Sequence, residues 1–95
     1  MYMRIIHGQT QPGQAEELAR RWEEFVLPRL KDAPGLQHAY HGVDQAANTT
    51  CGVTVWDSRP DEEMMNRNLE DFRARVSDIL AGPPQVEEYD VLAHR

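Results

Sequence analysis

The chain has 95 residues, the size of a single domain, so we expect residues 1–95 to form one folded unit. Hydrophobic residues make up 40% and charged residues 27%, a balance typical of a globular rather than a disordered protein. The net charge is −6 and Lys and Arg are spread along the sequence, which argues against a nucleic-acid partner. No apolar run could span a membrane and no secretory signal pattern is present, so we expect a cytoplasmic protein.

The first third of the sequence predicts a strand followed by a helix. Residues 3 to 10 have strand character, with Ile5 and Ile6 on opposite faces. From Gln14 the apolar spacing becomes helical and forms one stripe, made by Leu18, Trp22, Phe25, Val26 and Leu30. Pro28 lies inside this stripe and lacks a backbone donor, so we expect the helix to kink there or to end just before it.

The middle of the sequence predicts two strands joined by a turn. Leu36–Val43 is too short and too rich in aromatic residues for a helix, and Asp44–Asn48 has the composition of a turn. Thr49–Trp56 gives the strongest strand signal because β-branched residues dominate it.

A second helix and a last strand complete the pattern. Ser58 is expected to cap the helix, with Pro60 in its first turn. The amphipathic stripe that follows is made by Met65, Leu69, Phe72, Val76 and Ile79. Gly82–Pro84 ends this helix, and Val86–Ala93 is predicted to form a strand.

The order β-α-β-β-α-β predicts an α+β fold of the ferredoxin-like type, in which two helices cover one face of a four-stranded antiparallel sheet. Both faces of the sheet carry apolar side chains: Val53 and Val55 lie on one face of their strand, and Trp56 lies on the other. Because two helices cover only one face, a second copy of the sheet is the simplest cover for the other. We therefore expect a homodimer that pairs through the sheet face.

A family pattern runs through three segments of the sequence: Arg4–Glu17, Leu27–Leu36 and Val53–Ser58. Together they resemble the antibiotic-biosynthesis monooxygenase domain over nearly the whole chain. The resemblance implies a ferredoxin-like protomer that dimerises into an α+β barrel, with a cleft between each sheet and its helices. It also implies no cofactor, because characterised relatives oxidise quinols or anthrones with molecular oxygen and neither metal nor flavin. Other relatives degrade haem, process small signalling molecules or isomerise lactones.

The sequence departs from the family at the polar positions of its known reactions. Haem-degrading relatives place a His on the second helix where this chain has Asn66, and an Asn in the first strand where it has Ile6 or His7. Aromatic-polyketide monooxygenases use an Asn four residues before the strand Trp, and Gly52 stands there in this chain. Many quinol-type members carry a His early in the second helix, which this chain lacks. The resemblance thus supports the fold more than any one reaction, and Asn66 disfavours haem binding.

His38 and Tyr40 are the candidate catalytic residues, since residues two apart on a strand share one face. Facing a cleft, His38 could take the proton of an aromatic hydroxyl, and Tyr40 could donate a hydrogen bond to the resulting anion. The alternative is that both are ordinary side chains of an edge strand. His41 points away from His38, so the two cannot chelate one metal, and we expect no metal site. Cys51, the only cysteine, is expected to be inert.

Four residues are candidate substrate contacts: Trp56, Thr54, Ile6 and Met65. The resemblance implies that Trp56 lines the cleft, and Thr54 shares its face. Ile6 lies on the face opposite Ile5, and Met65 could line a flexible apolar pocket at the start of the second helix. The alternatives are a core Trp56 whose N–H finds an acceptor and a Met65 that only packs in the core.

Two functional hypotheses follow from these residues. The first is a cofactor-independent monooxygenase-like protein that acts on, or binds, a small aromatic or quinol-like compound beside Trp56. The second is a non-catalytic dimeric module, for small-molecule binding or a stress response, without monooxygenase activity. The missing Asn and His positions of the family favour the second hypothesis.

Overall fold

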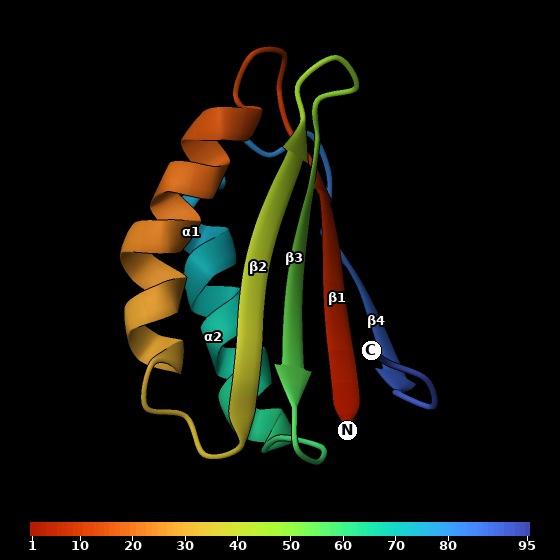
Figure 1. The fold of residues 1–95 in the computed structure, drawn as a ribbon. Helices are drawn as coiled ribbons and strands as arrows, with labels where there is room; N and C mark the ends of the chain where they lie inside the picture. Colours follow the sequence, from red (N-terminus) through yellow and green to blue (C-terminus); the bar gives the residue numbers. More distant parts are fainter.

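The computed structural model describes residues 1–95 as two layers, an antiparallel sheet with both helices on one of its faces (Figure 1). The elements are β1 (Tyr2–Gln9), α1 (Ala15–Leu30), β2 (Leu36–Asp44), β3 (Thr49–Trp56), α2 (Glu62–Arg75) and β4 (Gln85–Asp90). The four strands lie in the order β2-β3-β1-β4, so the first strand is internal and the last is at an edge. This confirms the predicted ferredoxin-like α+β fold. Neither helix is both long enough and apolar enough to cross a membrane.

Helix α1 continues through Pro28 to Leu30, so the alternative in which the helix ends before Pro28 is wrong. A proline removes the hydrogen bond of its own nitrogen and crowds the carbonyl four residues earlier, but the helix continues beyond it, and Lys31 donates its backbone N–H to the Leu27 carbonyl at 3.0 Å. Pro28 is exposed, so its ring lies at the helix surface. The apolar stripe on the opposite side of α1 supplies the buried Leu18, Trp22 and Leu30.

Helix α2 begins later than the sequence predicts. Its N-cap is Asp61, whose carboxylate accepts the backbone N–H of Glu63 at 3.0 Å. The prediction of Ser58 as the cap is therefore wrong, and Pro60 precedes the helix instead of lying in its first turn. Asp61 is equally suited to capping, and it follows the proline directly.

Both C-terminal elements are shorter than predicted. Helix α2 ends at Arg75, whereas the apolar stripe continues to Ile79. The residues after the helix form a turn, in which Val76 and Ile79 are still buried. Strand β4 covers residues 85–90, and beyond it Val91 still donates its N–H to the Met1 carbonyl at 2.9 Å. The buried apolar residues thus extend beyond the end of α2. Strand β4 ends at Asp90, which pairs with Tyr2, the first residue of β1.

The inner face of the sheet, toward the helices, alternates with the outer face along each strand. Cross-strand pairing places Tyr2 opposite Trp56, Arg4 opposite Thr54 and Ile6 opposite Gly52 on the inner face. Two core clusters form between this face and the helices. One contains Leu18, Trp22, Phe72, Val76 and Ile79, and the other contains Tyr2, Leu30, Trp56 and Met65.

The outer face carries Met3, Ile5, Val53 and Val55, which are only partly buried. Tyr89 of β4 shares this face and is 46% exposed. No other element of the chain covers these side chains, since both helices lie on the inner side (Figure 1). The prediction that both faces of the sheet are apolar is confirmed.

Strand β2 contains an irregularity that decides which of its side chains face the helices. Leu36 pairs with Trp56, but the next residue of β3, Val55, pairs with His38 instead of Gln37. One extra residue in a strand reverses the face on which the following side chains lie. As a result His38 and Tyr40 lie on the outer face, whereas His41 lies on the inner face.

Candidate functional site

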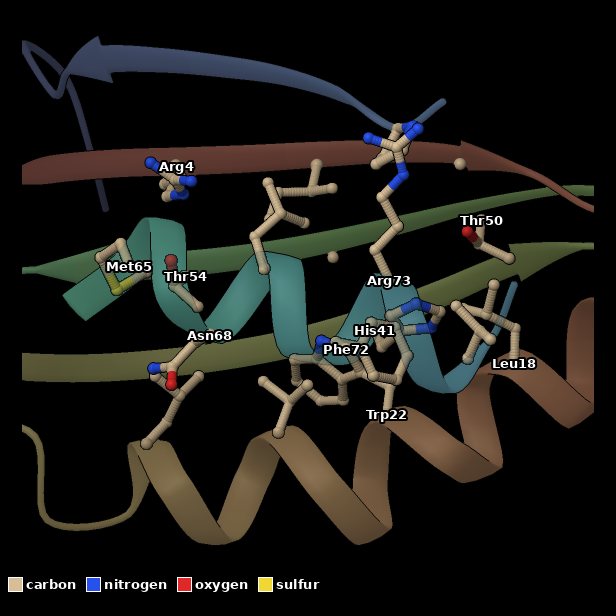
Figure 2. Close-up of a pocket in the computed structure, with 18 of the residues that line it drawn as sticks. Arg4, Leu18, Trp22, His41, Thr50, Thr54, Met65, Asn68, Phe72 and Arg73 are labelled. Carbon is tan, nitrogen blue, oxygen red and sulfur yellow. The ribbon is translucent and has the colours of Figure 1, made fainter. Parts of the chain in front are cut away.

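A cavity lies between the inner face of the sheet and the two helices (Figure 2). Its volume is about 80 Å³, within a hollow whose whole empty space, open mouth included, is about 760 Å³. The walls are mostly apolar and include Ile6, Trp22, Val26, Leu30, Leu69 and Phe72. A concave apolar space with a few polar groups is the usual form of a small-molecule site.

His41 is the imidazole of the cavity wall, and its ring centroid lies 5.1 Å from that of Trp22. Its Nδ1 is buried and has no hydrogen-bond partner. Burial lowers the pKa of His41 from 6.5 to about 4, because the charged form loses its water. The imidazole is therefore neutral at pH 7, and one of its nitrogens faces no competing protein group.

Gly52 makes room for these two rings. A Cβ at this position would lie 3.5 Å from His41 Cδ2 and 3.6 Å from Trp22 Nε1, which is ordinary contact distance. A side chain longer than Ala at position 52 would have to share this space with the two rings. At the position where aromatic-polyketide monooxygenases have an Asn, this chain thus has a glycine, and the rings of His41 and Trp22 lie next to it.

Arg4 forms a polar cluster at another part of the cavity wall. It is 3% exposed, and its Nη1 donates to the carboxylate of Glu88. The Tyr2 hydroxyl donates to the same carboxylate at 2.5 Å, and Arg59 Nη2 lies 3.6 Å from it. The Tyr2 hydrogen bond and then the Arg4 charge hold the pKa of Glu88 below its usual range, while burial raises the pKa of Tyr2. The Nε of Arg4 is buried without a partner.

Arg73 is a second guanidinium at the cavity. It is exposed, and Figure 2 shows it extending from α2 toward the β1 side of the sheet. No Asp or Glu lines the cavity. The charged side chains that line the cavity, Arg4 and Arg73, are therefore both cationic, although the whole chain carries a net charge of −6.

The structure brings three of the predicted substrate contacts to the cavity: Ile6, Thr54 and Met65 line it. Trp56 is instead 0% exposed, packs in the core, and donates its indole N–H to Thr54 Oγ1 at 2.9 Å. Trp56 therefore has the geometry of the alternative interpretation, a core Trp whose N–H finds an acceptor. Whether any of these residues contacts a substrate stays a prediction.

His38 and Tyr40 do not reach the cavity. Their rings lie together on the outer face with centroids 6.0 Å apart, and Tyr40 is 61% exposed. The expectation that they face the same cleft as Thr54 is corrected by the bulge at the start of β2, which no residue in the sequence marks.

Arg4, His41 and Arg73 were not predicted as site residues from the sequence. The signal for Arg4 was available, since it shares one face of the predicted strand with Ile6, and a charged residue on an apolar face is unusual. His41 was placed correctly on the face opposite His38. The missing step was to know which of these two faces the helices cover.

The fold and the cavity together define a class: a ferredoxin-like α+β domain that holds a mostly apolar cavity between its sheet and its helices. By sequence alone the chain matches no protein-family model and no curated protein. Solved structures share its fold over nearly its whole length.

A monooxygenase from the gene ActVA-Orf6 of Streptomyces coelicolor, in complex with nanaomycin D, matches with a TM-score of 0.77 at 16% identity, covering 99% of this chain and 89% of that chain. A protein named antibiotic biosynthesis monooxygenase matches with a TM-score of 0.70 at 14% identity, covering 98% of this chain and 100% of that chain. NE2512 from Nitrosomonas europaea, a protein of unknown function, matches with a TM-score of 0.72 at 19% identity, covering 99% of this chain and 91% of that chain. The resemblance to antibiotic-biosynthesis monooxygenases is confirmed in the fold.

Proposed function

We propose that this protein binds a small aromatic or quinol-like compound in the cavity and oxidises it with molecular oxygen, without a metal or an organic cofactor. The observation that carries the proposal is the imidazole of His41, which is neutral and has a buried, unpartnered Nδ1 in a mostly apolar wall. A neutral imidazole can accept a proton from a bound hydroxyl. A structure of the same fold in complex with nanaomycin D supports a ligand in this class.

The chemical step begins with transfer of the ligand's acidic proton to His41. This gives an imidazolium and a phenolate or enolate side by side, and their attraction is stronger in an apolar cavity than in water. The guanidinium groups of Arg4 and Arg73 add positive charge that stabilises the anion. The electron-rich anion then reacts with O₂. In an anthrone a ring CH₂ becomes C=O, one oxygen atom stays in the product, and the other leaves as water with both hydrogens.

A second candidate function is binding without catalysis. No carboxylate lines the cavity, and a pKa of about 4 makes His41 a weak base until an anion lies beside it. These two features favour a module that holds a small molecule and leaves it unchanged.

We also propose that two copies pair through the outer face. Its apolar side chains, among them Ile5 and Val53, have no cover within the chain. Pairing of two such faces removes apolar surface from water at the centre of both sheets. His38 and Tyr40 lie on this face, so a catalytic role for them would require a site formed at that interface.

Oxygen uptake with a panel of hydroquinones and anthrones tests the proposal. We expect uptake by the wild type, its loss in His41→Gln, and its retention in the matched control His38→Ala on the outer face. Loss in His38→Ala alone would move the site to the outer face. Binding of the same compounds without any oxygen uptake would favour the non-catalytic module, and the absence of both binding and uptake would refute the proposal.

A further inference from the structure

We infer that the ligand of this cavity carries a carboxylate, which binds the free edge of the Arg4 guanidinium. The inference rests on the proposed function, because it names the chemical class of the ligand for the same cavity. It concerns recognition, however, and holds whether or not the bound ligand is oxidised.

The position of Arg4 is the first observation. Its side chain is 4% exposed and lines the cavity, and Figure 2 shows it at the same end as Met65 and Thr54. The contact with Glu88 uses Nη1, so the edge formed by Nε and Nη2 is not engaged by that carboxylate. Nε itself is buried and has no partner. A buried N–H donor of a charged group is unfavourable without an acceptor, so a ligand that supplies an acceptor to this edge would gain binding free energy.

The shape of that edge selects the acceptor. Two parallel N–H groups of a guanidinium match the two oxygens of a carboxylate, which accept both hydrogen bonds at once. A carbonyl or hydroxyl oxygen offers a single acceptor atom and carries no charge. A carboxylate therefore satisfies both the geometry and the charge of Arg4.

The charge balance of the cluster points the same way. Arg4 and Arg59 contribute two positive charges and Glu88 one negative charge, while Tyr2 contributes only a neutral hydroxyl to Glu88. The cluster thus carries one net positive charge, with Arg4 in the cavity wall and Arg59 exposed outside it. Because the chain as a whole carries −6, a general attraction for acids is absent, and the preference must come from this local cluster.

The sheet register separates the two polar parts of the cavity. Arg4 lies opposite Thr54, and His41 lies opposite Gly52 on the other side of β3. Their Cα atoms are thus two residues apart along the strands and two strands apart across the sheet, roughly 7 Å by 10 Å. A ligand anchored by its acid group at Arg4 would extend its ring system toward His41.

Isothermal titration calorimetry with three related compounds tests this inference: 6-hydroxy-2-naphthoic acid, its methyl ester and 2-naphthol. We expect the acid to bind the wild type about tenfold or more tightly than the ester. That preference should disappear in the double variant Arg4→Met with Glu88→Gln, which removes both partners of the ion pair. It should weaken in Arg4→Lys, which keeps the charge but loses the two-pronged edge. Arg67→Met, on the exposed side of α2 and away from the cavity, should keep it.

The outcomes separate this inference from the proposed function. Equal binding of acid and ester by the folded wild type, or a preference that persists in the double variant, would overturn the carboxylate assignment and leave an aromatic-binding cavity. If none of the three ring compounds binds, the aromatic-binding function fails and the assignment fails with it. If the double variant does not fold, the wild-type comparison and Arg4→Lys decide the question.

Discussion

The half-buried imidazole of His41 should make the stability of the protein depend on pH between about 6.5 and 4. Its pKa is 6.5 in the unfolded chain and about 4 in the folded protein. As the pH falls below about 6.5, the unfolded state binds a proton that the folded state does not, so the free energy of unfolding decreases. The decrease continues until the pH reaches about 4, where the folded state is protonated as well.

The magnitude follows from the difference in pKa. Each pKa unit corresponds to about 1.4 kcal/mol, so the full depression would amount to about 3 kcal/mol. The side chain is only partly buried, and solvent screening reduces the effect, so between pH 7 and pH 4.5 we expect a loss of about 1–2 kcal/mol.

Urea unfolding followed by circular dichroism at pH 7 and pH 4.5 and at fixed protein concentration measures this loss. In His41→Phe an aromatic ring that does not titrate still lies against Trp22, so the loss between the two pH values should be smaller by about 1–2 kcal/mol. His38→Phe, on the exposed outer face, is the matched control and should behave as the wild type. If wild type and His41→Phe lose the same free energy, the imidazole is not desolvated as described.

Three other features can be tested by single substitutions. Thr54→Val removes the acceptor of the buried Trp56 indole N–H and should lower the free energy of unfolding by about 1–3 kcal/mol, measured by chemical denaturation. Asp61→Ala should cost about 1 kcal/mol because it removes the cap of α2, whereas Ser58→Ala should have little effect, and a reversed order would contradict the assigned helix start. Ile5→Glu places a charge on the outer face and should convert the proposed dimer of the 10.9 kDa chain to monomer in light scattering, while an unchanged mass would argue against pairing through that face.

The sequence was sufficient for the element order and for most of the core, and its failures have local physical causes. Thr49–Trp56 was predicted to the residue because β-branched side chains and alternation agree there. Helix α1 passed through Pro28 because a single missing hydrogen bond at an exposed position is tolerated once the stripe behind it is buried. Tertiary packing outweighed local propensity in that case.

The candidate site was harder to predict than the fold because it depends on strand parity. A single bulge before His38 reverses the faces on which the following side chains of β2 lie, and it becomes visible only in the pairing of β2 with β3. Ile6, Thr54 and Met65 were assigned to the cavity because their strands and helix are regular. His41 is recognised only once the covered face is known.

The sheet order also has a consequence for synthesis. Strand β1 pairs with β3 on one side, but its other neighbour, β4, leaves the ribosome after every other element. Until then β1 is an open edge that can pair with other chains, and Arg4 has no Glu88 to neutralise it. The cationic end of the cavity is therefore completed last, so a nascent chain holds the apolar walls of the site before it holds the ion pair that positions Arg4.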